Sequence, residues 1–377
     1  MSAAPPSEDS PLSRYHRQML LPGFGAEGQA RLAQSTVLVA GCGALGCGIA
    51  DALARAGVGR LVLVDRDVVE LTNLQRQTLF DHAQANAGLP KAVAAAERLA
   101  LVNPEVALQP EIVDLGSGTI DRLAGTVDAI ADGLDNFETR YLLNDAAVRW
   151  GIPLVYGGAV GLTGMCLPIL PHPRHRRGPG GSVRWTEAES SPCLRCLFPE
   201  PPPPGASPTC DTVGVLGPVV AIVAALQSAH LLKLLTGQHA TLDRRMACID
   251  LGDNEFRFMD VSSAGPSEEC PCCGLGEFSF LEGLAGGGTT TLCGRSAVQV
   301  TPAGDGASFD LAAVADRLQP HGRFERTRFM VRGSFAQERT ATGQPISISL
   351  FGDGRAILHG IDEAERARAL YARYIGS

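Results

Sequence analysis

The stretch from Ser35 to Asp67 constrains the fold of this chain more than any other part of the sequence. An apolar run, Val37–Ala40, leads into the glycine-rich sequence GCGALG and a helix of small residues, and a second apolar run, Leu61–Val64, ends in Asp65. This order predicts a strand, a glycine turn, a helix and a second strand, the opening unit of a doubly wound α/β sheet.

The glycines of this turn predict a phosphate site. In such a turn one glycine allows a sharp bend, one lets the backbone approach a phosphate, and one lets the helix pack close to the sheet. The N-terminus of the following helix offers free N–H groups to an anion, and Asp65 can accept hydrogen bonds from ribose hydroxyls. The alternative is a tight structural turn without a ligand. NAD, FAD and ATP are all compatible with the motif, whose glycines are Gly41, Gly43 and Gly46.

A polar loop, residues 66–77, follows at the carboxyl end of the second strand, where doubly wound sheets bind ligands. It carries Asn73, Arg76 and Gln77, whose guanidinium and amide groups suit a triphosphate. A solvated polar loop is an equal alternative.

Lys91 begins an alanine-rich helix. A lysine there is exposed by default, but beside phosphates its charge would be functional.

A third apolar run, residues 127–131, predicts another buried strand, and it is followed by Asp132-Gly133-Leu134-Asp135-Asn136. Two aspartates at the end of a strand beside a phosphate site suit Mg²⁺. The alternative for Asp135 is an N-cap of the helix predicted over 138–149. A further strand, 152–156, leads into a glycine-rich segment, 157–161, which we expect to be a loop that lets another backbone come close.

Two Cys-x-x-Cys pairs predict a closed structural zinc site, with Cys193 and Cys196 in one pair and Cys270 and Cys273 in the other. A redox dithiol would need only one pair, and Cys272 leaves open which cysteines of the second pair bind. Cys210 precedes a long helix, whose dipole would lower the pKa of its thiol. This makes Cys210 the best candidate for a nucleophile, with an ordinary loop thiol as the alternative.

The remaining segments define the domain organisation. Residues 1–13 contain no signal peptide and are expected to be disordered. The apolar stretch 213–235 is interrupted by polar residues, so we expect it to form a buried helix, and we expect no membrane partner. The chain carries a net charge of −8, which argues against a nucleic-acid partner. A main domain over 14–277, a linker over 278–292 and a small α+β domain over 293–377 are expected. The predicted fold class is therefore a Rossmann-like doubly wound sheet with a four-cysteine zinc site, plus this small C-terminal α+β domain.

Seven motifs together resemble the ThiF/MoeB family of adenylyltransferases, relatives of the ubiquitin-activating enzymes. They are RYHRQ, GCGALG, VDRDVVELTNLQRQ, GLPK, DGLDNFETR, CLRCLFPEPPPP and CPCCG, and the likeness covers about Arg14 to Gly274. The resemblance implies a cytoplasmic homodimer that uses ATP and Mg²⁺ to adenylate the C-terminal glycine of a ubiquitin-like sulfur-carrier protein ending in Gly-Gly. It also implies that Zn²⁺ holds the structure on the substrate side together.

The same resemblance assigns roles by position. Gly41, Gly43 and Gly46 would line the nucleotide, Asp65 would hold the ribose, and Asn73, Arg76 and Lys91 would bind phosphates. Asp135 would order magnesium, and Asp67, Gln77 and Asn136 would join the nucleotide site. Arg17 matches an arginine that reaches the ATP of the neighbouring subunit. Cys210 looks like the cysteine that forms an acyl-disulfide with the carrier in the thiazole branch and is dispensable in the molybdopterin branch.

Other functions stay open at this point. A thioester-forming enzyme for protein conjugation or tRNA thiolation would use the same activation step. An NAD-dependent oxidoreductase fits the glycine turn alone, and a zinc scaffold would need no catalysis. The C-terminal segment resembles the tail of some bacterial ThiF-like enzymes and does not resemble a rhodanese domain, so a separate sulfur donor such as a cysteine desulfurase is expected. The segment Gly164–Leu167 and the apparent insertion at 171–181 depart from the family pattern.

Overall fold

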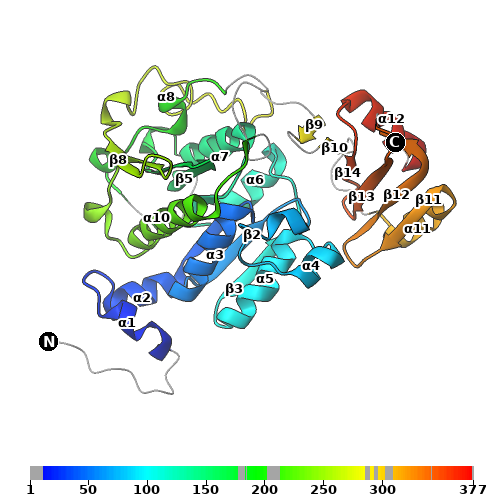
Figure 1. Cartoon of the computed structure of the whole chain (residues 1–377). Helices are drawn as coiled ribbons and strands as arrows, with labels where there is room; N and C mark the ends of the chain where they lie inside the picture. The colour runs from blue at the N-terminus through cyan, green and yellow to red at the C-terminus, as the bar shows by residue number, and fades with distance from the viewer. Residues whose placement is uncertain are drawn as a thin grey trace. The chain divides into compact units, whose positions relative to one another are not determined.

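The computed structural model of the 377-residue chain describes residues 12–176, 183, 185–201, 213–284, 289–292, 296–301, 309–340 and 342–375. The chain divides into two compact units (Figure 1). The first contains residues 1–204 and 214–285, and the second contains residues 205–213 and 286–377. Cys210 and residues 1–11 of the expected disordered terminus lie outside the described residues.

An eight-stranded sheet with the order β3-β2-β1-β4-β5-β6-β7-β8 organises the first unit. The five strands from β3 to β5 are parallel, and β6, β7 and β8 continue the sheet antiparallel. The doubly wound sheet expected from the sequence is thus confirmed. The strands are β1 (Thr36–Ala40), β2 (Arg60–Val64), β3 (Ala107–Glu111), β4 (Ala129–Asp132), β5 (Leu154–Val160), β6 (Thr163–Ile169), β7 (Met246–Asp250) and β8 (Glu255–Met259).

Helices cover both faces of this sheet. One hydrophobic core lies under α3, α5 and α10, and a second lies under α6 and α7 and includes the paired cysteines. The helices are α1 (His16–Met19), α2 (Gly25–Gln34), α3 (Ala44–Ala56), α4 (His82–Ala87), α5 (Lys91–Val102), α6 (Ser117–Ala124), α7 (Phe137–Trp150), α8 (Leu194–Leu197) and α10 (Gly217–Leu235). The short 3₁₀ turns are η1 (Ser13–Tyr15), η2 (Leu71–Asn73), η3 (Pro173–His175), η4 (Glu187–Glu189), η5 (His239–Thr241) and η6 (Ser262–Ala264).

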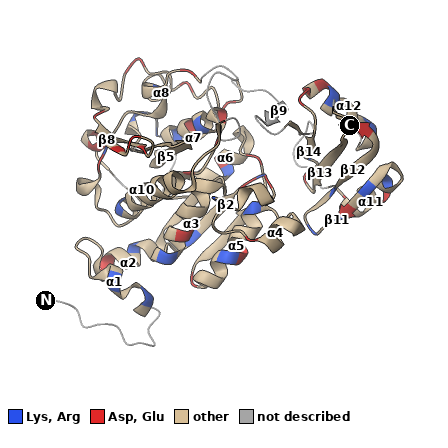
Figure 2. Cartoon of the chain, in the orientation of Figure 1, with Lys and Arg blue, Asp and Glu red and all other residues tan. Residues whose placement is uncertain are grey.

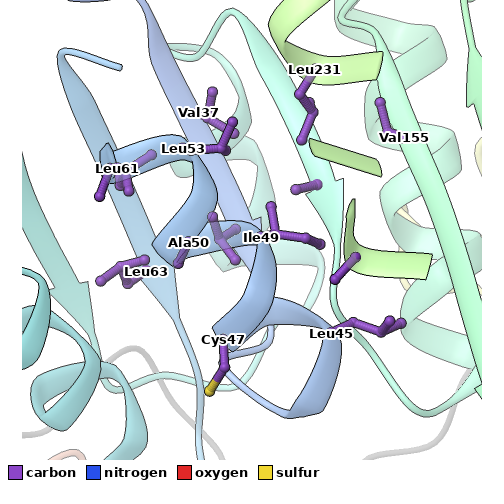
Figure 3. Packing of buried hydrophobic residues seen from close by; sticks show 14 of the residues in the cluster. Val37, Leu45, Cys47, Ile49, Ala50, Leu53, Leu61, Leu63, Val155 and Leu231 are labelled. Atoms are coloured by element: carbon purple, nitrogen blue, oxygen red, sulfur yellow. The ribbon is translucent and has the colours of Figure 1, made fainter. Parts of the chain in front are cut away.

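The first core explains why α3 is built from small and aliphatic residues. Ile49 and Leu53 of α3 are fully buried, as are Val37 of β1, Leu61 of β2 and Leu231 of α10 (Figure 3). A Cβ added to Gly48 would lie 2.9 Å from the Cβ of Ala224, so α3 and α10 meet at a point where only small residues fit. Burial of apolar surface on both faces of the central strands holds this layer together.

The glycine-rich segment 157–161 differs from the expected loop. Gly157 and Gly158 lie inside β5, which runs to Val160. A Cβ on Gly157 would lie 2.3 Å from the carboxamide carbon of Gln227, a fully buried side chain of α10. The loop prediction was therefore wrong: the glycine makes room for a side chain and not for another backbone.

Helix α10 occupies most of the apolar stretch 213–235. It is long and apolar enough to cross a membrane by length and composition, and half of that window is buried inside the structure. It packs against α3, β5 and β6. Acidic and basic residues are interspersed along the helices of the first unit in the view of Figure 2.

The second unit has its own six-stranded antiparallel sheet, with the order β11-β12-β13-β14-β10-β9, and its own hydrophobic core. Its elements are β9 (Thr289–Leu292), β10 (Ala297–Val300), α11 (Leu311–Leu318), η7 (Gln319–His321), β11 (Gly322–Arg326), β12 (Met330–Arg339), β13 (Pro345–Phe351), β14 (Ala356–His359) and α12 (Ala364–Tyr374). The segment expected to be a linker over 278–292 begins with the buried Phe278 and Leu281 and ends in β9.

Candidate functional site

The glycine turn after β1 contains two glycines that the protein's own packing requires. Gly41 has a positive φ of 89°, and its N–H donates to Val64 O at 2.8 Å. A Cβ on Gly41 would lie 2.8 Å from Gly133 O, and one on Gly46 would lie 1.8 Å from Gly41 O. Any side chain at either position would collide with backbone, so these two glycines shape the turn and seat α3 against it.

Gly43 has a different environment. It is the N-cap of α3, has a negative φ of −76°, and a Cβ there would meet no described atom closer than 3.8 Å. Beside it lies Gln77, which is 3% exposed and whose Oε1 has no hydrogen-bond partner among the described residues. The Nε2 of Gln77, a donor, lies 4.0 Å from this Cβ position. Open space at a helix N-terminus beside an amide donor suits an anionic ligand.

Asp65 ties the turn to the loop that follows β2. Its Oδ2 accepts the N–H of Cys42 and its Oδ1 accepts the N–H of Asp67, both at 2.7 Å. Burial raises the pKa of the Asp65 carboxyl group, and the nearby Lys91 ammonium opposes that shift. The carboxylate predicted to hold a ribose therefore also fixes the backbone on both sides of the site.

Lys91 is buried, contrary to the exposed position expected by default for a lysine in an alanine-rich helix. It is 3% exposed, its Nζ donates to Asp67 Oδ2 at 3.3 Å, and its backbone N–H donates to Asp67 O at 2.9 Å. A buried ammonium is costly unless it is paired. The pairing with Asp67 therefore keeps a positive charge at the sheet edge where the glycine turn lies.

The polar loop after β2 is ordered by Asn73. This residue is 1% exposed, and its Oδ1 accepts the N–H of Glu70 at 3.0 Å. Its backbone carbonyl accepts the N–H groups of Arg76 and Gln77 at 3.1 and 3.0 Å. Arg76 is half-buried, with Nη1 donating to Thr72 O at 3.0 Å.

The turn after β4 lies beside the glycine turn. The N–H of Gly133 donates to Ala40 O at 2.8 Å, and a Cβ on Gly133 would lie 2.5 Å from Gly41 O. Strand order reverses between β1 and β4, so this is the switch point at which ligands bind in such sheets. The structure thus brings the glycine turn, the loop after β2 and the turn carrying Asp135 to one edge.

The two aspartates of that turn differ, which corrects the expectation of a paired magnesium site. Asp132 is 1% exposed; its Oδ2 accepts a hydrogen bond from Arg140 Nε at 3.2 Å and its Oδ1 accepts the N–H of Leu134 at 3.0 Å. Asp135 is exposed. The N-cap of α7 is Asn136, whose Oδ1 accepts the N–H of Thr139 at 2.9 Å, so the cap does not need Asp135.

Arg17 lies at the other end of α3. It is exposed, and its side chain has no hydrogen bond or ion pair to another described residue. Its neighbour Gln18 donates through Nε2 to Ala56 O, at the C-terminus of α3, at 3.0 Å. A helix of 13 residues is about 20 Å long, so Arg17 is distant from the glycine turn of its own chain.

The paired cysteines come together as a candidate metal centre. The sulfur atoms of Cys193, Cys196, Cys270 and Cys273 all lie within 4.8 Å of one another. Cys272 is outside this group. It is fully buried, and its Sγ accepts a hydrogen bond from Asn144 Nδ2 at 3.3 Å. The Oδ1 of Asn144 accepts the N–H of Leu194 at 2.8 Å, so this residue of α7 holds both cysteine segments.

Three buried polar residues were missed by the sequence analysis: Arg140, Asn144 and Gln227. Arg140 and Asn144 are one turn apart on the same face of α7, and polar residues four apart inside an otherwise apolar helical pattern are a usable signal. Gln227 interrupts the apolar α10, where its Nε2 donates to Asp132 O and Val155 O at 2.8 and 3.0 Å.

Comparison with known proteins gives consistent results. Residues 15–272 match the model of the ThiF family. The chain is 35% identical over 364 residues to the sulfur carrier protein ThiS adenylyltransferase of Bacillus subtilis, covering 96% of this chain and 99% of that protein. It is 41% identical over 263 residues to the sulfur carrier protein adenylyltransferase of Thermus thermophilus, covering 70% and 91%. The crystal structure of E. coli MccB with ATP is similar in fold, with a TM-score of 0.55, 21% identity and coverage of 71% of this chain and 75% of that chain.

Proposed function

Because the chain belongs to the ThiF family, we propose that it is an adenylyltransferase that activates the C-terminal glycine carboxylate of a ubiquitin-like sulfur-carrier protein with MgATP. The observation that carries this proposal is the match, over nearly the full length of both chains, to a protein named for adenylylation of the carrier ThiS. Another relative is named SAMP-activating enzyme E1, from Haloferax volcanii.

The proposed reaction is an attack of the carrier carboxylate on the α-phosphorus of ATP. The bond between the carboxylate oxygen and phosphorus forms, the bond to the bridging oxygen breaks, and pyrophosphate leaves with its electron pair. Lys91 and Arg76 of one chain, with Arg17 of a second copy, spread the charge that develops on the phosphates. The fixed turn at Gly41, Gly43 and Gly46 aligns the nucleotide, with Asp65 at its ribose.

Mg²⁺ would complete the charge balance at this site. The exposed carboxylate of Asp135 fits it, since Mg²⁺ takes one or two carboxylates and completes its shell with water and phosphate oxygens. Bound there with ATP, the ion would neutralise phosphate charge. Asp67, Asn73, Gln77 and Asn136 are assigned to shaping the nucleotide pocket.

Zn²⁺ fits the four-cysteine cluster. Four thiolates in two chelating turns make a closed tetrahedral site with no position for a substrate, which is a structural role. The site would join segments that are 74 residues apart in the chain, from Cys196 to Cys270.

Transfer of the activated acyl group to sulfur would follow adenylylation. Cys210 is the residue we assign to a covalent step with the carrier, and a separate protein such as a cysteine desulfurase is the proposed source of sulfur. We expect these partners in the cytoplasm, with no part for nucleic acid or membrane.

Isotope exchange between pyrophosphate and ATP tests the proposal. The purified protein is assayed with each diglycine-ended carrier protein from the same genome, and exchange is expected with one of them only when its terminal glycine is intact. Asp135→Ala is expected to reduce exchange by about 10²- to 10³-fold, because it removes the proposed magnesium ligand. Absence of exchange with every carrier, or full exchange after Asp135→Ala, contradicts the proposal. Uptake of NAD in place of ATP would favour an oxidoreductase.

A further inference from the structure

Arg140 is a buried residue in the first turns of α7, directly after the turn of residues 132–136. It is 7% exposed, and its guanidinium lies 5.6 Å from the ring centroid of Phe137 and 5.4 Å from that of Tyr156. A buried guanidinium is retained where its planar set of donors matches several acceptors at once.

The guanidinium connects three parts of the sheet edge. Its Nε donates to Asp132 Oδ2 at 3.2 Å, at the end of β4. Its Nη2 donates to Leu134 O at 2.6 Å, inside the turn, and to Gly157 O at 2.9 Å, in the neighbouring strand β5. One side chain therefore fixes the start and the middle of the turn against the rigid sheet.

Asp135 lies between two fixed points. Arg140 holds Leu134 on one side, and Asn136 on the other side is held as the N-cap of α7. The Asp135 carboxylate itself is exposed, and Asn136 Nδ2 approaches its Oδ1 no closer than 3.5 Å. The backbone of the turn thus fixes the point from which this carboxylate projects, and Arg140 is the side chain that ties Leu134 O of that backbone to the sheet.

We propose that Arg140 is a positioning residue that holds the turn of residues 132–136 in the shape that presents the Asp135 carboxylate to a magnesium nucleotide. The inference rests on the proposed function for the use of MgATP, and within the described residues Arg140 makes no direct hydrogen bond to the Asp135 side chain. A lysine at this position would keep the charge but could not satisfy Asp132, Leu134 O and Gly157 O together, because one ammonium lacks the planar fork.

The test measures ATP binding by calorimetry over a series of Mg²⁺ concentrations, with the zinc content of each protein verified. Arg140→Lys is expected to raise the Mg²⁺ concentration for half-maximal ATP binding by about 10- to 100-fold, the usual effect of losing a partner behind a metal ligand. Arg149→Lys is the matched control, since Arg149 lies on the same helix with its guanidinium 6.0 Å from the ring centroid of Phe278. It is expected to leave the Mg²⁺ dependence unchanged.

A double-variant cycle separates positioning from general loss of stability. Asp135→Asn should shift the Mg²⁺ dependence in the same direction, and Arg140→Lys should add nothing to it, because both act through one carboxylate. Amide exchange should also rise over residues 133–136 and stay unchanged in α10. An unchanged Mg²⁺ dependence in Arg140→Lys, or additive shifts in the double variant, would overturn the inference.

Two further outcomes are kept distinct. If wild type binds no ATP at any Mg²⁺ concentration, the proposed function fails, and the inference about Arg140 falls with it. If Arg140→Lys does not fold, Asp132→Asn replaces it. This change removes the negative charge and turns one of the two oxygens that accept from Arg140 Nε and the Leu134 N–H into an NH2 group that cannot accept, at nearly constant size. The same shift in Mg²⁺ dependence is then expected, and its absence overturns the inference.

Discussion

At the scale of single residues, the glycines of the turn after β1 have different roles: Gly46 is needed for folding, whereas Gly43 leaves space for a ligand. Gly46 cannot carry a Cβ, because the added atom would overlap Gly41 O, whereas Gly43 has room for one. We expect the free energy of unfolding of Gly43→Ala to lie within about 1 kcal/mol of wild type. That of Gly46→Ala should be lower than wild type by about 3 kcal/mol or more. Chemical unfolding of both variants measures the difference.

Nucleotide binding completes this prediction. The Cβ of Gly43→Ala would occupy the approach of a phosphate to the N-terminus of α3, so this stable variant is expected to bind ATP at least about tenfold more weakly. The prediction is wrong if Gly43→Ala binds ATP as wild type does. Loss of both stability and binding would show that Gly43 is needed for the turn itself.

Lys91 and Arg140 show what the sequence could and could not indicate at this scale. The sequence placed Lys91 at the start of a helix, and the structure confirms that start. Its burial depends on Asp67, a residue 24 positions away, and no local pattern encodes that pairing. Arg140 was visible only as part of a motif, because its three acceptors come from β4, the turn and β5.

At the scale of elements, strands with an apolar pattern were predictable and edge strands were not. The apolar runs at β1, β2 and β5 indicated strands, since both faces of a central parallel strand are buried. Strand β3 reads ALQPE and β8 reads EFRFM, and each lies at an edge of the sheet, where every residue of β8 is exposed, Phe256 and Phe258 included. These two edge strands were not predicted, and neither were the interior strands β6 and β7, whose antiparallel pairing joins segments distant in the sequence.

Helix α10 gives a prediction about pH. Burial lowers the pKa of His230 to about 4, with Lys233 adding to the shift and Asp243 opposing it. A histidine in an unfolded chain titrates near pH 6.5, so below that pH the unfolded chain takes up a proton that the folded chain does not. The stability associated with the neutral imidazole is therefore complete above about pH 6.5 and is lost as the pH falls toward 4, at up to ~1.4 kcal/mol per pH unit.

Replacement of the His230 imidazole should reduce the loss of folding stability between pH 7 and pH 5. His230→Gln is expected to lower the difference between the free energies of unfolding at pH 7 and pH 5, measured by urea denaturation. His82→Gln removes an exposed histidine and serves as the control. Equal pH dependence in wild type and His230→Gln would contradict the assignment.

At the scale of the whole molecule, the cysteine cluster links segments that are distant in sequence. The sulfur atoms of Cys193 and Cys270 lie 3.6 Å apart, and those of Cys196 and Cys273 lie 3.3 Å apart. With four buried or half-buried thiols this close, metal binding is expected to contribute several kcal/mol to folding. Chelation should lower the melting temperature of the first unit and release about one Zn²⁺ per chain.

Neighbouring cysteines provide the matched variants for this prediction. Cys273→Ser removes a ligand and should lower the zinc content and the melting temperature. Cys272→Ser, one residue earlier, changes only the sulfur that accepts a hydrogen bond from Asn144, and zinc content should stay near wild type. Zinc loss in Cys272→Ser with zinc retained in Cys273→Ser would mean that the fifth cysteine, and not Cys273, is the ligand.

The proposed role of Arg17 at the ATP of a second copy makes one chain alone an incomplete enzyme. It lies near the C-terminus of α3 and Lys91 lies near the glycine turn, so the two can act on one nucleotide only if they come from different copies. Arg17→Ala and Lys91→Ala are each expected to abolish pyrophosphate exchange. After unfolding and random reassembly in equal amounts, half of the dimers are mixed and each has one intact site, so about a quarter of wild-type activity should return.

This recovery requires that Arg17 acts across the dimer. Mixing Arg17→Ala with a second preparation of Arg17→Ala gives the matched control, since no site in that mixture is complete. If mixed dimers are verified by mass spectrometry and exchange stays absent, Arg17 acts within its own chain or at another step. Because the residual activity of each variant is near zero, even a partial recovery distinguishes these outcomes.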